Sequence, residues 1–128
     1  MGNTIIDMSD GEYIVDIVEM QSSIDTKNRK LVVWVLKLVE GAHAGCTFPK
    51  NFYLTTPKVV DFMKKELLLV GISANSAEDF ESKKSQAYGK RIRIEALTNE
   101  QGFRVYYVKG VIGQVNVTPA VAAKDIGW

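Results

Sequence analysis

The feature that most constrains this fold is the order of apolar patterns along the chain. Three segments with the alternation or the β-branched composition of strands come first, a helical stretch follows, and two strand-like segments come last. The expected strands are residues 13–20, 31–40, 46–54, 90–98 and 103–112, and the expected helices are residues 57–70 and 76–84. A chain of 128 residues has the length of one domain with a single hydrophobic core.

The helical stretch has recognisable start and stop signals. Thr56 is placed to cap the helix, and Pro57 suits the first helical position because that position needs no backbone N–H donor. Gly71 is a typical residue just after a helix end. These signals separate the first three strands from the last two.

The order β-β-β-α-β-β predicts a mainly β domain with a helical insertion, folded as a five-stranded antiparallel OB-like barrel. An open antiparallel sheet with helices on one face is the alternative. Residues 1–10 are expected to form a leader, 11–112 the OB-like domain and 113–128 a tail. In an OB barrel the binding surface lies over the second and third strands, between the first and last hairpin loops. Three aromatic residues are assigned to the core by their apolar company, namely Trp34, Phe48 and Phe52.

The residues that would carry catalysis or bind a metal or cofactor are largely missing. His43 is the lone histidine, it lies in a glycine-flanked turn, and Cys46 has no second cysteine with which to bind zinc. Neither a phosphate-binding loop nor a dinucleotide fingerprint occurs. The helical acidic residues are expected to face solvent: Asp61, Glu66, Glu78, Asp79 and Glu81. We therefore predict that the protein is neither a nuclease nor any other enzyme, and that it uses no metal and no cofactor.

Basic and aromatic residues on the expected strands and loops give the positive functional signal. The net charge of +1 excludes a surface that is basic all over, so nucleic-acid binding requires a local patch. Binding single strands without sequence preference needs cations for phosphates and rings on which bases stack. The candidate residues for binding single-stranded DNA are Lys27, Arg29, Lys30, Lys50, Tyr53, Arg91, Arg93, Arg104 and Tyr106.

Each of these residues also has a simpler interpretation. The cations at residues 27–30 can serve solubility alone, and Arg91 and Arg93 can protect an exposed strand from pairing with other chains.

Leu31, Val33 and Val35 share a face opposite the expected core. Either both faces of this strand are covered, or the apolar face contacts DNA bases, a partner protein or a second copy of the chain.

The chain has the character of a cytoplasmic protein. A single cysteine forms no intrachain disulfide, which fits a reducing compartment. The N-terminal residues lack the pattern of a secretory signal, and the longest apolar run, residues 31–38, is too short to span a bilayer. No membrane association is expected.

Several motifs between residues 10 and 112 match a known pattern. They are Gly11-Glu12-Tyr13, the turn from Val39 to Gly45, Asn51 to Leu54, Leu67 to Ile72, Gly89-Lys90-Arg91 and the last strand from Phe103 to Gly110. In these motifs the chain resembles a family of uncharacterised bacteriophage proteins from replication and recombination gene cassettes. The resemblance implies an OB-like fold and a single-strand binder that works beside a phage recombinase or another replication protein.

The sequence therefore leads to two hypotheses from different classes. The first is a largely sequence-independent single-stranded-DNA-binding protein that supports phage DNA replication or recombination in the host cytoplasm. The second is a phage protein-interaction module that binds a host or recombination partner through the exposed face at Leu31, Val33 and Val35.

Overall fold

A computed structural model describes residues 9–114, and it is mainly β with a helical insertion, as predicted. Five antiparallel strands form one sheet, and the helices lie between the third and fourth strands. The strands are β1 (Gly11–Ile24), β2 (Lys30–Leu38), β3 (Thr47–Tyr53), β4 (Lys90–Thr98) and β5 (Arg104–Gln114). The helices are α1 (Pro57–Leu69), α2 (Ala77–Lys83) and the short 3-10 helix η1 (Lys84–Ala87).

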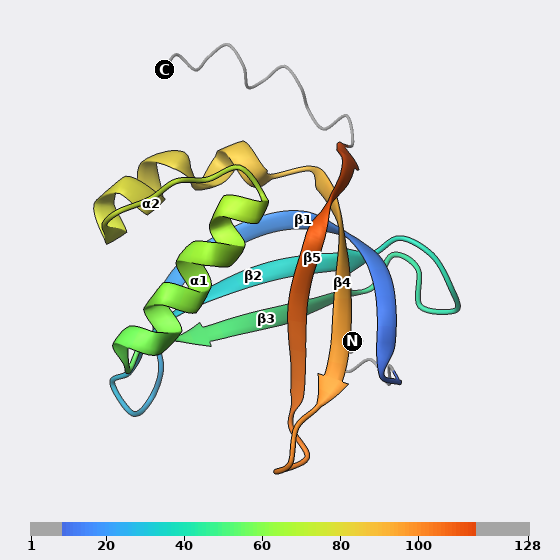
Figure 1. The fold of residues 1–128 in the computed structure, drawn as a ribbon, viewed down its shortest axis with the longest axis horizontal. Coiled ribbons are helices and arrows are strands. Elements are labelled where there is room, and N and C mark those ends of the chain that lie inside the picture. The colour runs from blue at the N-terminus through green and yellow to red at the C-terminus, as the bar shows by residue number, and fades with distance from the viewer. Residues whose placement is uncertain (1–8, 115–128) are drawn as a thin grey trace.

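Strand β1 is the centre of the sheet, whose order is β3-β2-β1-β4-β5. Its first half pairs with β4, from Gly11 opposite Ala96, and its second half pairs with β2, as far as Ile24 opposite Lys30. A register shift between Ile17 and Glu19 accompanies the bend between the two halves. As a result, β4 and β5 run steeply across the direction of β2 and β3 (Figure 1).

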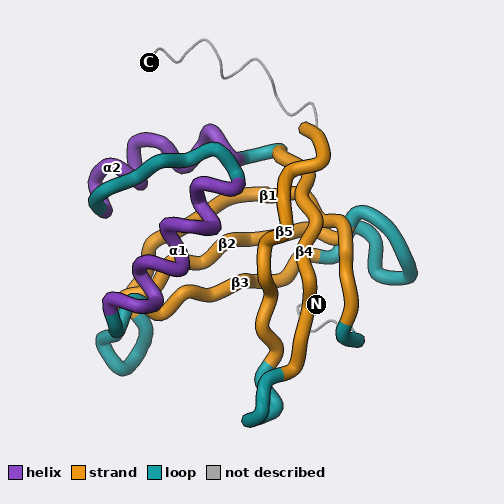
Figure 2. The backbone as a smooth tube through the Cα atoms, viewed as in Figure 1, coloured by secondary structure: helices purple, strands orange, loops and turns teal. Residues whose placement is uncertain are grey.

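The sheet is consistent with an OB-like fold, but the predicted barrel is not closed. Strands β3 and β5 end the sheet order, and they are not paired with each other by strand hydrogen bonds. We call the gap between them the open seam. Helix α1 lies beside this seam and contacts both strands, so the helical insertion covers the opening (Figures 1 and 2).

The core lies between the sheet and α1, and it follows the two-residue period of the strands. Trp34 is 0% exposed, and Phe48 and Phe52 are also buried, as the sequence predicted. Helix α1 contributes Met63 and Leu67. The remaining strand residues of the core are Val15, Ile17, Met20, Val32, Leu36, Leu38, Ile92, Ile94 and Val108.

Helix α1 begins and ends at the signals read from the sequence. The Thr56 hydroxyl accepts a hydrogen bond from the Val59 backbone N–H, and Pro57 occupies the first turn. At the other end Gly71 takes a φ of +90°, a conformation in which glycine avoids the strain of a side chain. Lys90 then donates a 2.6 Å hydrogen bond to the free Val70 carbonyl.

The main difference in element bounds concerns the first hairpin. The expected strands end at residue 20 and resume at residue 31, but β1 continues to Ile24 and β2 begins at Lys30, which leaves only residues 25–29 as the turn. The polar residues extend the strand because their backbones keep pairing with β2 beyond the core. The expected leader and tail, residues 1–10 and 113–128, lie almost entirely outside the described residues. Across residues 9–114, no helix has the length and apolar character needed to cross a bilayer.

Candidate nucleic-acid interface

The β1–β2 turn, residues 25–29, holds its cations in a fixed arrangement. One Asp25 carboxylate oxygen accepts the backbone N–H groups of Lys27 and Arg29, both at 2.9 Å. The other oxygen pairs with the Arg29 guanidinium at 2.6 Å, and Asn28 has a φ of +64° in the turn. The backbone and side-chain hydrogen bonds from Arg29 lower the pKa of Asp25, so the turn keeps its charged acceptor.

A stacked pair lies beside this turn. The Arg29 guanidinium lies 4.6 Å from the ring centroid of Tyr53, at the end of β3. Lys27 and Lys30 flank Arg29 and are exposed, and within residues 9–114 neither makes an ion pair. Lys27 in the turn and Lys30 at the start of β2 therefore present two uncompensated positive charges next to a half-exposed aromatic ring.

Lys50, which was predicted to contact phosphate, points inward instead. Its side chain is 4% exposed, its ammonium lies 2.9 Å from a Glu66 carboxylate oxygen, and it donates to the Tyr106 carbonyl. Rings of Phe52 and Phe62 lie 4.5 and 5.5 Å from the same ammonium. Burial lowers the pKa of Lys50, while the Glu66 carboxylate opposes that lowering. We exclude Lys50 from the interface, because a buried ammonium cannot reach a phosphate.

Glu66 lies at the other end of this contact, and the prediction that it faces solvent is wrong. Its side chain is 4% exposed, and its second carboxylate oxygen accepts the Val108 backbone N–H at 2.8 Å. We name Lys50 and Glu66 the clasp. The clasp joins β3, α1 and β5 at the open seam, where it satisfies backbone groups of Tyr106 and Val108.

The two arginines of β4 face outward while Ile92 and Ile94 are buried, as the alternation predicted. Both arginines form ion pairs with carboxylates of β1. Arg91 makes two hydrogen bonds to the Asp16 carboxylate, of 2.7 and 3.1 Å. Arg93 lies 3.7 Å from Glu12. The charges of Arg91 and Arg93 are therefore partly compensated, and these arginines are less available for phosphates than Lys27 and Lys30.

Arg104 and Tyr106 of β5 do not form one exposed binding face. The Arg104 guanidinium lies 2.8 Å from Asp10. The Tyr106 ring is half-buried and packs against Phe48 at 4.9 Å between centroids. Burial raises the pKa of the Tyr106 phenol. These contacts give Tyr106 a place at the edge of the core, where little of its ring is free for a base.

Phe103, which was not among the predicted site residues, is at 67% the most exposed large hydrophobic residue in the described range 9–114. It follows the β4–β5 turn, where the Asn99 side chain accepts the backbone N–H groups of Gln101 and Phe103. An aromatic residue directly after a polar turn is the sequence signal that would have indicated it. The β1–β2 and β4–β5 turns both project toward the lower edge of the view, the first at the lower left and the second at the bottom (Figure 1).

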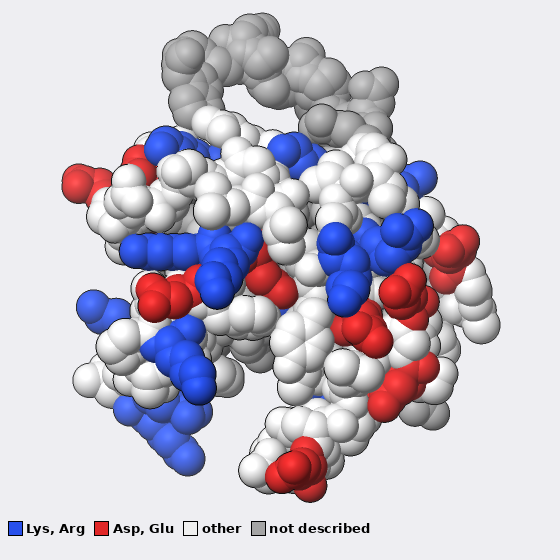
Figure 3. Space-filling view, in the orientation of Figure 1, with Lys and Arg blue, Asp and Glu red and all other residues white. Residues whose placement is uncertain are grey.

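The charge distribution argues for a local interface. Basic and acidic side chains interleave over the face seen in Figure 3, and the surface is hollowed between the two lower lobes.

The face proposed for a protein partner is partly covered, because Leu31 is only 8% exposed and Val33 and Val35 are half-buried. In residues 9–114, no three His, Cys, Asp or Glu side chains gather closely enough to hold a metal ion.

Comparison with protein families and with curated proteins found no match to this chain. The likeness to phage replication and recombination proteins therefore stays a prediction from sequence motifs. Four residues of the candidate interface lie at the β1–β2 turn and the adjacent ends of β2 and β3, and Phe103 lies at the β4–β5 turn. We name this candidate interface the two-turn surface: Lys27, Arg29, Lys30, Tyr53 and Phe103.

Proposed function

We propose that this protein binds single-stranded DNA, largely independently of sequence, along the two-turn surface. The observation that carries the proposal is the pair of uncompensated lysines, Lys27 and Lys30, beside the Arg29–Tyr53 stack. The OB-like order of the strands supports it, because OB folds bind oligonucleotides between these two loops.

Phosphate contacts and base stacking would fall to different residues of the two-turn surface. Lys27 and Lys30 would contact backbone phosphates, while Arg29, paired with Asp25, holds its guanidinium against the Tyr53 ring. Tyr53 and Phe103 offer ring surface on which bases stack. Stacking tolerates every base because each base has a π face. Sequence-tolerant binding of this kind fits the role in replication or recombination that the sequence resemblance implies.

The salt dependence of binding tests the proposal. We expect a fluorescently labelled oligo-dT of about 30 nucleotides to bind at low salt and to dissociate as salt rises. Each phosphate contact to a single strand contributes about −0.7 to the slope of log K against log salt. Replacing Lys27 and Lys30 together by alanine should therefore reduce the slope by about 1.4 and weaken low-salt binding by tenfold or more.

The matched control replaces Lys65, an exposed lysine of α1 outside the two-turn surface. Lys65→Ala should leave both the affinity and the slope unchanged. Phe103→Ala should weaken binding without changing the slope, because it removes stacking and no charge. Absence of binding at low salt, or equal losses from the turn variant and the Lys65 control, would contradict the proposal.

A further inference from the structure

A half-open apolar pocket of about 480 Å³ lies where α1 and α2 meet the end of β1 and the start of β2. Leu31, Leu54, Val60, Met63 and Phe80 supply its apolar walls. The volume lies within the range of small-molecule sites, which are mostly apolar with a few polar groups at fixed places. The pocket is separate from the clasp, since neither Lys50 nor Glu66 lines it.

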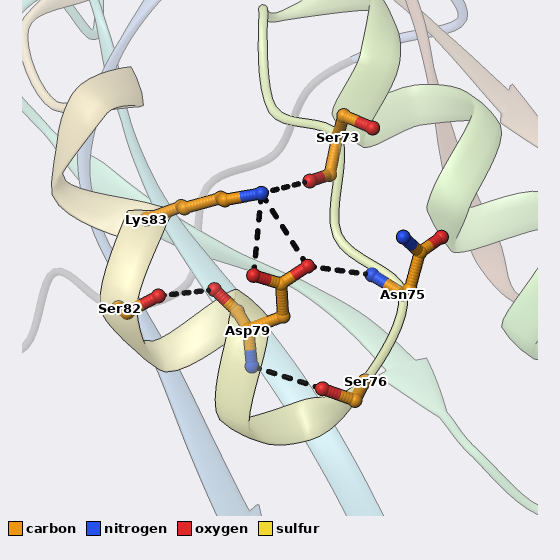
Figure 4. Close-up of polar contacts among 6 residues, drawn as sticks. All are labelled: Ser73, Asn75, Ser76, Asp79, Ser82 and Lys83. Carbon is orange, nitrogen blue, oxygen red and sulfur yellow. Dashed lines mark hydrogen bonds and ion pairs between the residues drawn. The ribbon is translucent and has the colours of Figure 1, made fainter.

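One wall of the pocket is a loop held in place by the start of α2. Residues 74–77 line the pocket, and the Ser76 hydroxyl caps α2 by accepting the Asp79 backbone N–H at 3.0 Å. The Asp79 carboxylate accepts the Asn75 backbone N–H, also at 3.0 Å. Lys83 donates to the Ser73 carbonyl and pairs with the same carboxylate, so the contacts form one network (Figure 4). The pocket wall is therefore preformed.

The charged residues that line the pocket have one sign. Lys30 and Lys64 line it, and of the described residues that line it none is Asp or Glu. Within residues 9–114, neither lysine makes an ion pair. Two of the three carboxylates of α2 are engaged elsewhere, because Asp79 pairs with Lys83 and Glu81 pairs with Lys84, and the third, Glu78, is exposed and does not line the pocket.

We propose that this pocket binds a small anionic amphiphile, with the apolar tail against Met63 and Phe80 and the anionic head near Lys64 and Lys30. The apolar walls favour an aliphatic tail, since burying its surface is favourable. The lysines favour an anionic head over a neutral or cationic one. This site is additional to the two-turn surface, with which it shares only Lys30.

Titration with two amphiphiles of equal tail length tests the proposal on the full chain. Calorimetry with sodium decanoate, below its micelle concentration, should show one saturable site. Decyltrimethylammonium, with the opposite head charge, should bind at least tenfold more weakly. Backbone amide shifts induced by decanoate should concentrate at Leu31, Met63 and Ala74.

Two variants and one control separate the head contact from the tail contact. Lys64→Met should weaken decanoate binding roughly three- to tenfold and leave decyltrimethylammonium binding no weaker. Ala77→Trp, at an exposed lining position, should block both ligands while the circular dichroism spectrum stays unchanged. Lys65→Met, on the same helix but outside the pocket, should bind decanoate as the parent does.

Three results would overturn the proposal: no saturable decanoate binding, equal affinity for both head groups, or amide shifts away from the pocket. Lys64 lies outside the two-turn surface, so Lys64→Met should keep its affinity for oligo-dT. Failure of the amphiphile site and failure of DNA binding are thereby distinguished.

Discussion

Replacing Glu66 by leucine should lower the free energy of unfolding by about 3–5 kcal/mol, because it leaves the buried Lys50 ammonium without its counterion. The substitution also removes the acceptor for the Val108 backbone N–H at the open seam. Lys50→Met should have a comparable effect, since the Glu66 carboxylate is then buried without its cation. Urea denaturation followed by circular dichroism measures both losses.

The double variant identifies the cause of these losses. Lys50→Met combined with Glu66→Leu removes both charges, so it should be more stable than either single variant. The double variant should not regain the full stability of the parent, because the Tyr106 carbonyl and the Val108 N–H lose their partners. Each unpaired backbone group costs about 1–3 kcal/mol. Glu78→Leu, at an exposed position of α2, is the control and should change stability by less than about 0.5 kcal/mol. A double variant less stable than both single variants would show that the clasp does not act as an ion pair.

Replacing Trp34 by alanine should lower the free energy of unfolding by about 3–5 kcal/mol, because the indole is fully buried and its loss opens a cavity in the core. Its ring centroid lies 5.3 Å from that of Phe52, so the cavity would also remove an aromatic contact. The melting temperature should fall by on the order of 15 °C in a thermal scan.

Trp34→Phe is the matched variant for this position. It keeps a ring in the core and removes the indole N–H, which is buried and has no hydrogen-bond partner among the described residues. Removing an unpaired buried donor offsets part of the lost packing, so we expect a loss smaller than that of Trp34→Ala. Equal losses for the two variants would show that the ring itself contributes nothing to the core.

The order of elements was readable from the sequence because each local signal had one physical meaning. The two-residue alternation assigned Ile92 and Ile94 to the core and Arg91 and Arg93 to the surface, which is what the structure shows. The aliphatic neighbours of Trp34 correctly placed it in the core. Thr56 and the glycine after α1 marked the helix ends for the same local reasons.

The clasp was not predicted, because its charged residues were taken to face solvent. Lys50 lies two residues from both Phe48 and Phe52, so the same strand period that placed those rings inside also places the lysine there. The carboxylate partners of Arg91 and Arg93 were not predicted for a different reason. Arg91 and Asp16 are 75 residues apart, and only the register of β1 against β4 brings them together.

The division of β1 between two partners has a consequence for how the chain folds. Pairing of β1 with β2 and of β2 with β3 joins neighbours in sequence, whereas Gly11 must find Ala96 across most of the domain. Closing so long a loop is entropically costly, so the β1–β2–β3 meander should form in the transition state before β4 docks. In stopped-flow refolding, Val32→Ala should then slow folding, while Ile94→Val should mainly speed unfolding. The reverse pattern would show that the long-range pairing nucleates the fold.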